Sequence, residues 1–164
     1  MITLVLGGAR SGKSAVAERL AARASGPVTY VATAAVDPAD ADHSARVAVH
    51  QDRRDPTWGT VEAGADLPVV LRATPGTVLV DSLGTWVTAH DDLAPDAVAL
   101  CAALLARGGD AVVVSEEVGL GVHPSSELGR RFRDALGAVN VAVADIADEV
   151  LLVVAGRLMP LERP

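Results

Sequence analysis

The stretch Gly7-Gly8-Ala9-Arg10-Ser11-Gly12-Lys13-Ser14 stands directly after the apolar run Ile2–Leu6. It fits the pattern G-x-x-x-x-G-K-[ST], in which the backbone N–H groups of a loop surround the phosphates of a nucleotide. The residues from Lys13 to about Ala24 are good helix formers, so a strand, a glycine-rich loop and a helix follow one another. This order aims N–H groups and the positive end of a helix dipole at an anion. The stretch therefore predicts a site for a nucleoside triphosphate.

Lys13 is the only lysine of the chain, and every other basic side chain is arginine. A loop closed around a triphosphate has room for a compact ammonium on a thin stem but not for a planar guanidinium. We expect Lys13 to contact the β- and γ-phosphates and the Ser14 hydroxyl to coordinate Mg²⁺. All residues of the loop are candidates for nucleotide binding, namely Gly7, Gly8, Ala9, Arg10, Ser11, Gly12, Lys13 and Ser14. The alternative is a chance glycine-rich turn, which the flanking strand and helix disfavour.

The length of 164 residues, half of them apolar, indicates a single domain, and together with the loop it predicts one P-loop nucleotide-binding domain over residues 1–164. The net charge of −7 disfavours non-specific binding to nucleic acid, which needs a basic surface. No apolar stretch approaches the about 20 residues that cross a bilayer. No secretory signal is visible before the first predicted strand. We therefore expect a cytoplasmic protein without membrane insertion. Cys101 is the only cysteine of the chain, so we expect it to be a reduced, structural thiol.

Apolar runs and helical segments alternate along the chain. Buried strands are predicted at Ile2–Leu6, Val28–Ala32, Thr77–Val80, Ala111–Val114 and Val150–Val154, with a short extra strand at Thr60–Glu62. Helices are predicted at Lys13–Ala24, Asp42–Asp52, Pro68–Ala73, Pro95–Arg107 and Ser125–Asp148. Such alternation is typical of parallel strands joined by helical crossovers. The predicted fold is α/β and P-loop NTPase-like, a mostly parallel central sheet with helices on both faces.

Polar residues follow four of the predicted strands. Besides the glycine-rich loop, they are Thr33, Asp81 and the pair Glu116-Glu117. Ligands of open α/β sheets bind at the carboxyl ends of the strands, so we expect these residues at one crevice, with Thr33 and Asp81 binding nucleotide. An apolar run that ends in Asp81 after a P-loop matches the Walker B pattern, whose carboxylate holds Mg²⁺. An aspartate that only caps the next turn is the alternative.

Motifs in several places resemble one family. They are the loop from Gly7 to Ser14 with Ala17-Glu18; Arg46-Val47-Ala48-Val49-His50 with Arg54, Trp58, Thr60 and Glu62; Asp81-Ser82-Leu83-Gly84-Thr85-Trp86; Glu117-Val118-Gly119-Leu120-Gly121; and Pro124, Arg130–Asp134, Gly137, Asn140 and Val153–Gly156. Together they cover nearly the whole chain. They resemble the bifunctional adenosylcobinamide kinase/adenosylcobinamide-phosphate guanylyltransferase family, which acts in cobalamin biosynthesis.

This resemblance implies two reactions on one substrate. A nucleoside triphosphate, GTP or ATP, first phosphorylates the aminopropanol hydroxyl of adenosylcobinamide. GMP then moves from GTP onto that phosphate, which releases pyrophosphate and gives adenosylcobinamide-GDP. The resemblance also implies a homo-oligomer, with a trimer as the first candidate.

The second reaction is implied to pass through a guanylylated histidine, and His50 holds that motif position. Asp42 fits the N-cap of a helix on which Arg46 and His50 share one face. A positive charge at Arg46 favours the neutral, nucleophilic imidazole, and its guanidinium could grip the α-phosphate under attack. Without the resemblance, a single histidine on a helix is more often packed or exposed than nucleophilic, so that alternative stays open.

Three further residues are candidates for the crevice. Glu62 could accept hydrogen bonds from guanine, which would favour GTP over ATP, or could be an exposed strand residue. Glu117 could lie beside the metal or accept the proton of the hydroxyl that reacts in the kinase step. Trp58 is a candidate for stacking on a ligand.

The chain departs from the family pattern at Glu116, where Asn is usual, and at Asp55, Ala89 and Val141. These departures bear on corrinoid contacts and substrate preference more than on the class of reaction. Two other functions fit a P-loop. One is a monofunctional small-molecule kinase in which His50 is structural, and the other is a nucleotide-dependent binding module without turnover.

Overall fold

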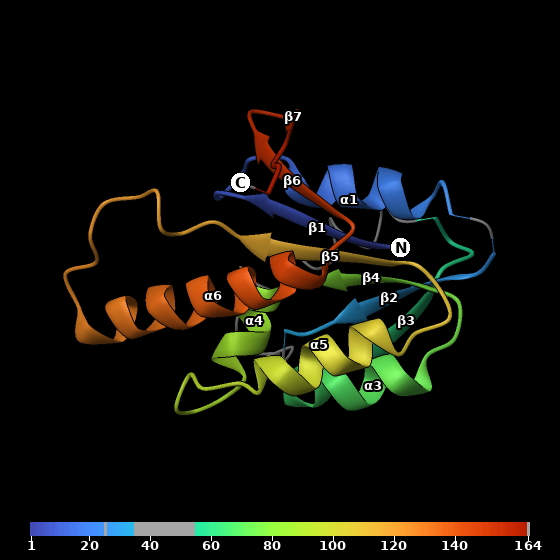
Figure 1. The fold of residues 1–164 in the computed structure, drawn as a ribbon, viewed down its shortest axis with the longest axis horizontal. Coiled ribbons are helices and arrows are strands. Elements are labelled where there is room, and N and C mark those ends of the chain that lie inside the picture. Colours follow the sequence, from blue (N-terminus) through green and yellow to red (C-terminus); the bar gives the residue numbers. More distant parts are fainter. Residues whose placement is uncertain (25, 35–54, 164) are drawn as a thin grey trace.

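A central sheet organises the computed structural model, which describes residues 1–24, 26–34 and 55–163 (Figure 1). Within these residues the strand order is β3-β2-β4-β5-β1-β6-β7. The strands are β1 (Ile2–Gly7), β2 (Val28–Ala32), β3 (Gly59–Glu62), β4 (Thr77–Asp81), β5 (Ala111–Glu116), β6 (Glu149–Val154) and β7 (Arg157–Pro160). Neighbouring strands are parallel except β6 and β7, which are antiparallel. The predicted mostly parallel sheet is confirmed.

Helices cover both faces of the sheet, as predicted (Figure 1). Helix α1 (Lys13–Ala21) packs on one face, and the other helices pack on the opposite face: α3 (Leu67–Ala73), α4 (Leu83–Thr88), α5 (Ala97–Leu105) and α6 (Glu127–Ile146). A short 3-10 turn, η1 (Gly64–Asp66), leads into α3. The predicted helix Asp42–Asp52 lies outside the described residues. Among the helices that are described, none is long and apolar enough to cross a membrane.

The strands divide the core into two layers because successive side chains of a strand point to opposite faces. In β5, Val112 and Val114 pack in the cluster that contains α1, whereas Val113 packs against the other helices. Full burial of an aliphatic side chain contributes about 1.5–3 kcal/mol, so both layers stabilise the sheet. The same alternation decides which polar residues at the strand ends reach the face that carries α1.

Predicted helix ends differ from the observed ones where polar side chains fix the first turn. Ser126 accepts from the Gly129 N–H and caps α6, and Asp96 accepts from the Ala99 N–H and caps α5. These residues are good N-caps, so each helix begins immediately after its cap. The predicted starts at Ser125 and Pro95 are therefore wrong by two residues in each case.

Two elements were absent from the prediction. Helix α4 has only six residues, too few for a hydrophobic period, and it is started by Ser82 and Thr85, which cap each other's backbone N–H groups. Strand β7 follows a turn in which Ala155 and Gly156 have φ of 50° and 73°, and all of its residues are exposed. An exposed strand without a buried apolar face leaves no alternating pattern to detect.

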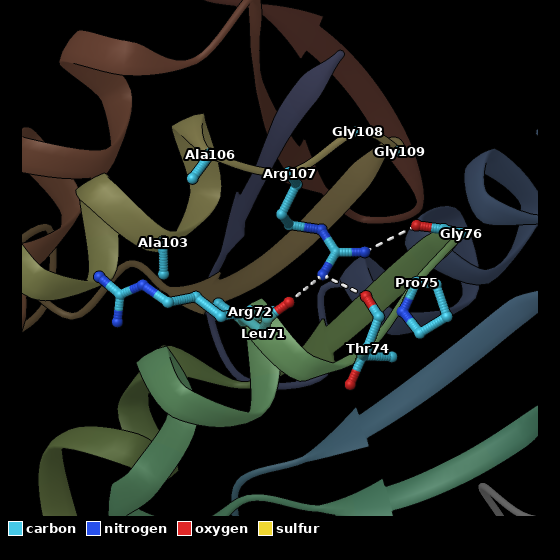
Figure 2. Close-up of a pocket in the computed structure, with 10 residues that line it drawn as sticks. All are labelled: Leu71, Arg72, Thr74, Pro75, Gly76, Ala103, Ala106, Arg107, Gly108 and Gly109. Carbon is cyan, nitrogen blue, oxygen red and sulfur yellow. Dashed lines mark hydrogen bonds between the residues drawn. The ribbon is translucent and has the colours of Figure 1, made fainter.

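Arg107 ties the helices α3 and α5 together at the amino ends of β4 and β5. Figure 2 shows its guanidinium pointing at backbone carbonyls, with hydrogen bonds to those of Leu71, Thr74 and Gly76. Burial lowers the pKa of Arg107, but arginine remains charged at neutral pH. These residues line a cavity of about 400 Å³. The cavity lies at the amino ends of these strands, whereas the glycine-rich loop follows the carboxyl end of β1, so the cavity is separate from the predicted crevice.

Candidate active site

The glycine-rich loop lies at the carboxyl end of β1, against the turn between β6 and β7. The Gly156 N–H donates to the Ser11 carbonyl at 2.8 Å, which fixes the loop to that turn. Gly12 has φ of 92°, a left-handed conformation that favours glycine. A Cβ at Gly7 would lie 2.8 Å from the Val153 carbonyl oxygen. The backbone therefore requires glycine at both positions, as the motif predicts.

Helix α1 begins at Lys13, and no side chain caps its N-cap residue Gly12. The first N–H groups of an α-helix have no partner within the helix. Here only the Lys13 N–H meets a side chain among the described contacts, the Ser11 hydroxyl at 3.3 Å. Such a helix start, wrapped by a loop, is suited to a phosphate group.

The Lys13 ammonium folds back over the loop. Its Nζ lies 3.4 Å from the Gly8 carbonyl oxygen and 3.6 Å from Oε1 of Glu116. The side chain is only 12% exposed, so the ammonium is held close to the loop and not spread into solvent. This is the position from which a lysine can contact phosphates seated in the loop.

Of the pair Glu116-Glu117 expected at the crevice, Glu116 is the carboxylate that meets Lys13, although it departs from the family pattern. Its Oε2 accepts hydrogen bonds from the Ser82 hydroxyl at 3.0 Å and from the Gly84 N–H at 3.1 Å. Register explains the contact, because Gly7 of β1 pairs with Glu116 of β5. Alternation along β5 could have predicted it, since Val112, Val114 and Glu116 point to the face that carries α1.

Asp81 ends β4, next to β5, and is partly buried. The Tyr30 hydroxyl of β2 donates to its Oδ2 at 3.1 Å. Asp81 shares the α1 face with Glu116, since Leu79 of the same strand packs in the α1 cluster. The structure thus brings Asp81, Glu116 and the loop to the carboxyl ends of three adjacent strands. Carboxylate and hydroxyl oxygens are the donors that Mg²⁺ prefers, so Ser14 and Asp81 fit that ion chemically.

Thr33 lies on the opposite face of the sheet and is fully buried. Its hydroxyl donates to the Ser82 carbonyl, accepts from the Ser82 N–H at 2.9 Å and contacts the Thr85 hydroxyl. Thr33 therefore anchors the start of α4 beside Glu116. Its predicted direct contact with nucleotide stays a prediction. In the structure the Thr33 hydroxyl instead bonds to Ser82 and contacts Thr85.

The Oε1 of Glu117 accepts from the Gly119 N–H at 2.7 Å, whereas the carboxylate near Lys13 is that of Glu116. Glu62 is exposed at the end of the edge strand β3, in register with Ala32 of β2. Trp58 is partly buried against the cluster that contains α1. The ligand contacts predicted for these three residues stay predictions. His50 and Arg46 lie outside the described residues.

Comparison with known proteins identifies the family. The family model described as cobinamide kinase / cobinamide phosphate guanyltransferase matches residues 3–161. The chain belongs to this family.

Curated relatives extend over nearly the full length of the chain. The bifunctional adenosylcobalamin biosynthesis protein CobP of Pseudomonas aeruginosa is 41% identical and covers 99% of this chain and 98% of its own length. The bifunctional adenosylcobalamin biosynthesis proteins CobU of Salmonella typhimurium and Escherichia coli are 35% and 37% identical, and each match covers 95% of this chain. The resemblance seen in the motifs is therefore confirmed.

A solved structure supports the fold alone. A prototypical ATPase from the type III secretion system of pathogenic bacteria superposes with a TM-score of 0.56 over 92% of this chain, at 11% identity. The match covers half of that ATPase. It confirms a P-loop-like α/β architecture in this member of the cobinamide kinase / cobinamide phosphate guanyltransferase family.

Proposed function

We propose that this domain phosphorylates adenosylcobinamide with a nucleoside triphosphate and then transfers GMP from GTP to the product, giving adenosylcobinamide-GDP. The observation that carries the proposal is the glycine-rich loop at the carboxyl end of β1, with the Lys13 ammonium folded back over it. Membership of a family described by both activities supports the same conclusion.

In the kinase step, the substrate hydroxyl attacks the γ-phosphorus, and the nucleoside diphosphate leaves. The N–H groups of the loop and the Lys13 ammonium bind the phosphate oxygens and stabilise the charge that develops on them. Ser14 and Asp81 are the residues proposed to hold Mg²⁺, which would supply further positive charge when bound. Tyr30 positions Asp81 through the hydrogen bond to Oδ2.

In the guanylyl transfer, we assign His50 as the nucleophile and Arg46 as the group that binds the α-phosphate. The imidazole attacks the α-phosphorus of GTP, a P–N bond forms and pyrophosphate leaves. The phosphate of the cobinamide product then attacks the same phosphorus and releases the histidine. Dividing the transfer into two displacements lets one pocket bind GTP first and the corrinoid phosphate afterwards.

The test is an intact-mass spectrum after incubation with GTP and Mg²⁺, run for the wild-type protein and for His50→Ala. We expect an added mass of GMP that survives alkali, is lost in acid and is absent from the variant. If no adduct forms while phosphoryl transfer to adenosylcobinamide persists, the chain is a monofunctional kinase and His50 is structural. Absence of both activities would favour a nucleotide-dependent binding module.

Assembly and location remain predictions. A homo-oligomer, with a trimer as the first candidate, agrees with apolar side chains exposed on and beside the edge strand β7: Val154, Leu158, Met159 and Leu161. Light scattering coupled to size-exclusion chromatography measures the mass in solution and decides this. A cytoplasmic location agrees with the biosynthetic names of the relatives.

A further inference from the structure

The phosphate-binding lysine already has an anionic partner inside the protein. The Glu116 carboxylate lies 3.6 Å from the Lys13 ammonium, and the two side chains are 29% and 12% exposed. The pair is thus only partly screened by water, and it stands where the phosphates of a nucleotide would have to meet the lysine.

Glu116 is held there by contacts with two other helices, α4 and α6. Its second carboxylate oxygen accepts from the Ser82 hydroxyl and the Gly84 N–H at the start of α4. Its backbone carbonyl accepts from Nδ2 of Asn140 on α6 at 3.1 Å. A side chain at Gly84 would collide with the carboxylate, so the glycine leaves space for it. The carboxylate is therefore a fixed part of the site and not a freely moving surface group.

A fixed negative charge beside Lys13 opposes a second anion. An incoming triphosphate can bind the Lys13 ammonium only by weakening the ion pair between Lys13 and Glu116. The bound triphosphate then lies beside the Glu116 carboxylate, which has the same sign of charge. Asp81 adds another carboxylate at the adjacent strand end. The metal complex of a triphosphate carries less negative charge than the free triphosphate, so this repulsion acts more strongly on the free form.

We propose that Glu116 makes this site select the Mg²⁺ complex of the nucleoside triphosphate against the metal-free form, through its contact with Lys13. The inference rests on the proposed nucleotide site and deepens it. Glu116 would then determine specificity through its negative charge. It lies near Asp81, because Asp81 pairs with Val114, two residues before Glu116 on β5.

The test measures the dissociation constant of GTP in excess Mg²⁺ and in EDTA, by competition against a fluorescent GTP analogue. Glu116→Gln removes the charge but keeps an acceptor for Ser82 and Gly84. We expect it to tighten metal-free GTP binding by about tenfold, the factor that ~1.4 kcal/mol corresponds to. Binding of the Mg²⁺ complex should change much less, so the ratio of the two constants falls.

Two control variants isolate the charge at this position. Glu149→Gln makes the same change of charge at an exposed residue that begins β6, at the amino-terminal end of the strand and away from the loop, and should leave the ratio at the wild-type value. Glu116→Asp keeps the charge and should retain most of the Mg²⁺ dependence. Glu116→Asn serves as a second neutral variant if the glutamine variant unfolds, which a thermal melt detects.

The outcomes separate this inference from the proposed site. Lys13→Ala should abolish GTP binding in both conditions, and if it binds like the wild type, the proposed nucleotide site is wrong. If Lys13→Ala fails to bind but Glu116→Gln keeps the wild-type ratio, the site stands and the role of Glu116 is overturned. Equal weakening of both nucleotide forms in Glu116→Gln would also overturn it, because a residue that only supports the loop has that effect.

Discussion

Lys13 is the central residue of the site, because both the glycine-rich loop and Glu116 contact its ammonium. Its ammonium sits within 3.4 Å of the Gly8 carbonyl oxygen in a side chain that is largely buried. A guanidinium is planar and broader, and it delivers its charge over a fork instead of a point. The size of the side chain at this position therefore matters as much as its charge.

We predict that Lys13→Arg, which preserves the charge, lowers the rate of phosphoryl transfer to adenosylcobinamide by about 100-fold or more, the loss typical of removing one well-placed donor to the transition state. The measurement is kcat at saturating nucleotide. Arg19→Lys, an exposed change on the last turn of the same helix, is the matched control and should leave kcat unchanged. Wild-type kcat in Lys13→Arg would show that the loop accommodates the broader cation.

The environment of Cys101 disfavours a reactive thiol. Its thiol donates to the Ala142 carbonyl of α6 at 3.4 Å. Partial burial, with a smaller effect of the Asp145 charge, raises the pKa of the Cys101 thiol. Because the thiolate is the reactive form, a raised pKa keeps the sulfur protonated at neutral pH. These contacts agree with the structural thiol expected from the sequence.

At the scale of elements, the contact between β5 and α6 fixes the end of the strand that carries Glu116. The buried Ser115 hydroxyl donates to Oδ1 of Asn140 at 2.6 Å, while Nδ2 of Asn140 donates to the Glu116 carbonyl. Asn140 is 7% exposed and Ser115 is fully buried, so water cannot readily replace either partner. A buried donor or acceptor left unpaired carries its full desolvation cost.

We predict that Asn140→Ala lowers the free energy of unfolding by about 2–3 kcal/mol, because it leaves the buried Ser115 hydroxyl and the partly buried Glu116 carbonyl without this partner. Urea denaturation followed by circular dichroism gives this value. Val141→Ala, at the exposed neighbouring position of α6, is the control and should cost less than about 0.5 kcal/mol. Equal losses in the two variants would mean that the pair contributes no more than an exposed methyl group does.

Elements also differ in how well the sequence predicts them. The strands β1, β2, β4 and β5 are buried apolar runs and were placed within two residues of the observed ends. Helix α4 and strand β7 were missed because neither has a periodic apolar face. Yet α4 supplies the Ser82 and Gly84 donors that hold Glu116, so a short, capped element escaped prediction although it shapes the site.

At the scale of the whole molecule, nucleotide binding is coupled to folding. A ligand that binds only the folded state stabilises it by about 2.7 kcal/mol at a concentration 100 times its dissociation constant. For a domain of this size, we predict that Mg²⁺ and GTP together raise the midpoint of thermal unfolding by about 5–10 °C at that saturation.

Differential scanning fluorimetry measures this shift, with Lys13→Ala as the variant that should lose it. EDTA should reduce this nucleotide-induced shift of the midpoint more in the wild-type protein than in Glu116→Gln. The melting experiment therefore tests the role of the Glu116 charge independently of the binding measurement. A midpoint that nucleotide does not move at any concentration would contradict the proposed site.

The sequence by itself determined the loop from Gly7 to Ser14, the alternation of strands and helices, and the family. These features are local, since a glycine motif and a hydrophobic period each lie within a short stretch of consecutive residues. The tertiary structure alone decided that Ser82 and Gly84 hold the Glu116 carboxylate beside Lys13, and that the Thr33 hydroxyl bonds to Ser82. Such contacts join residues far apart in sequence, and they depend on strand register and on which face each side chain takes, which a single residue of displacement reverses.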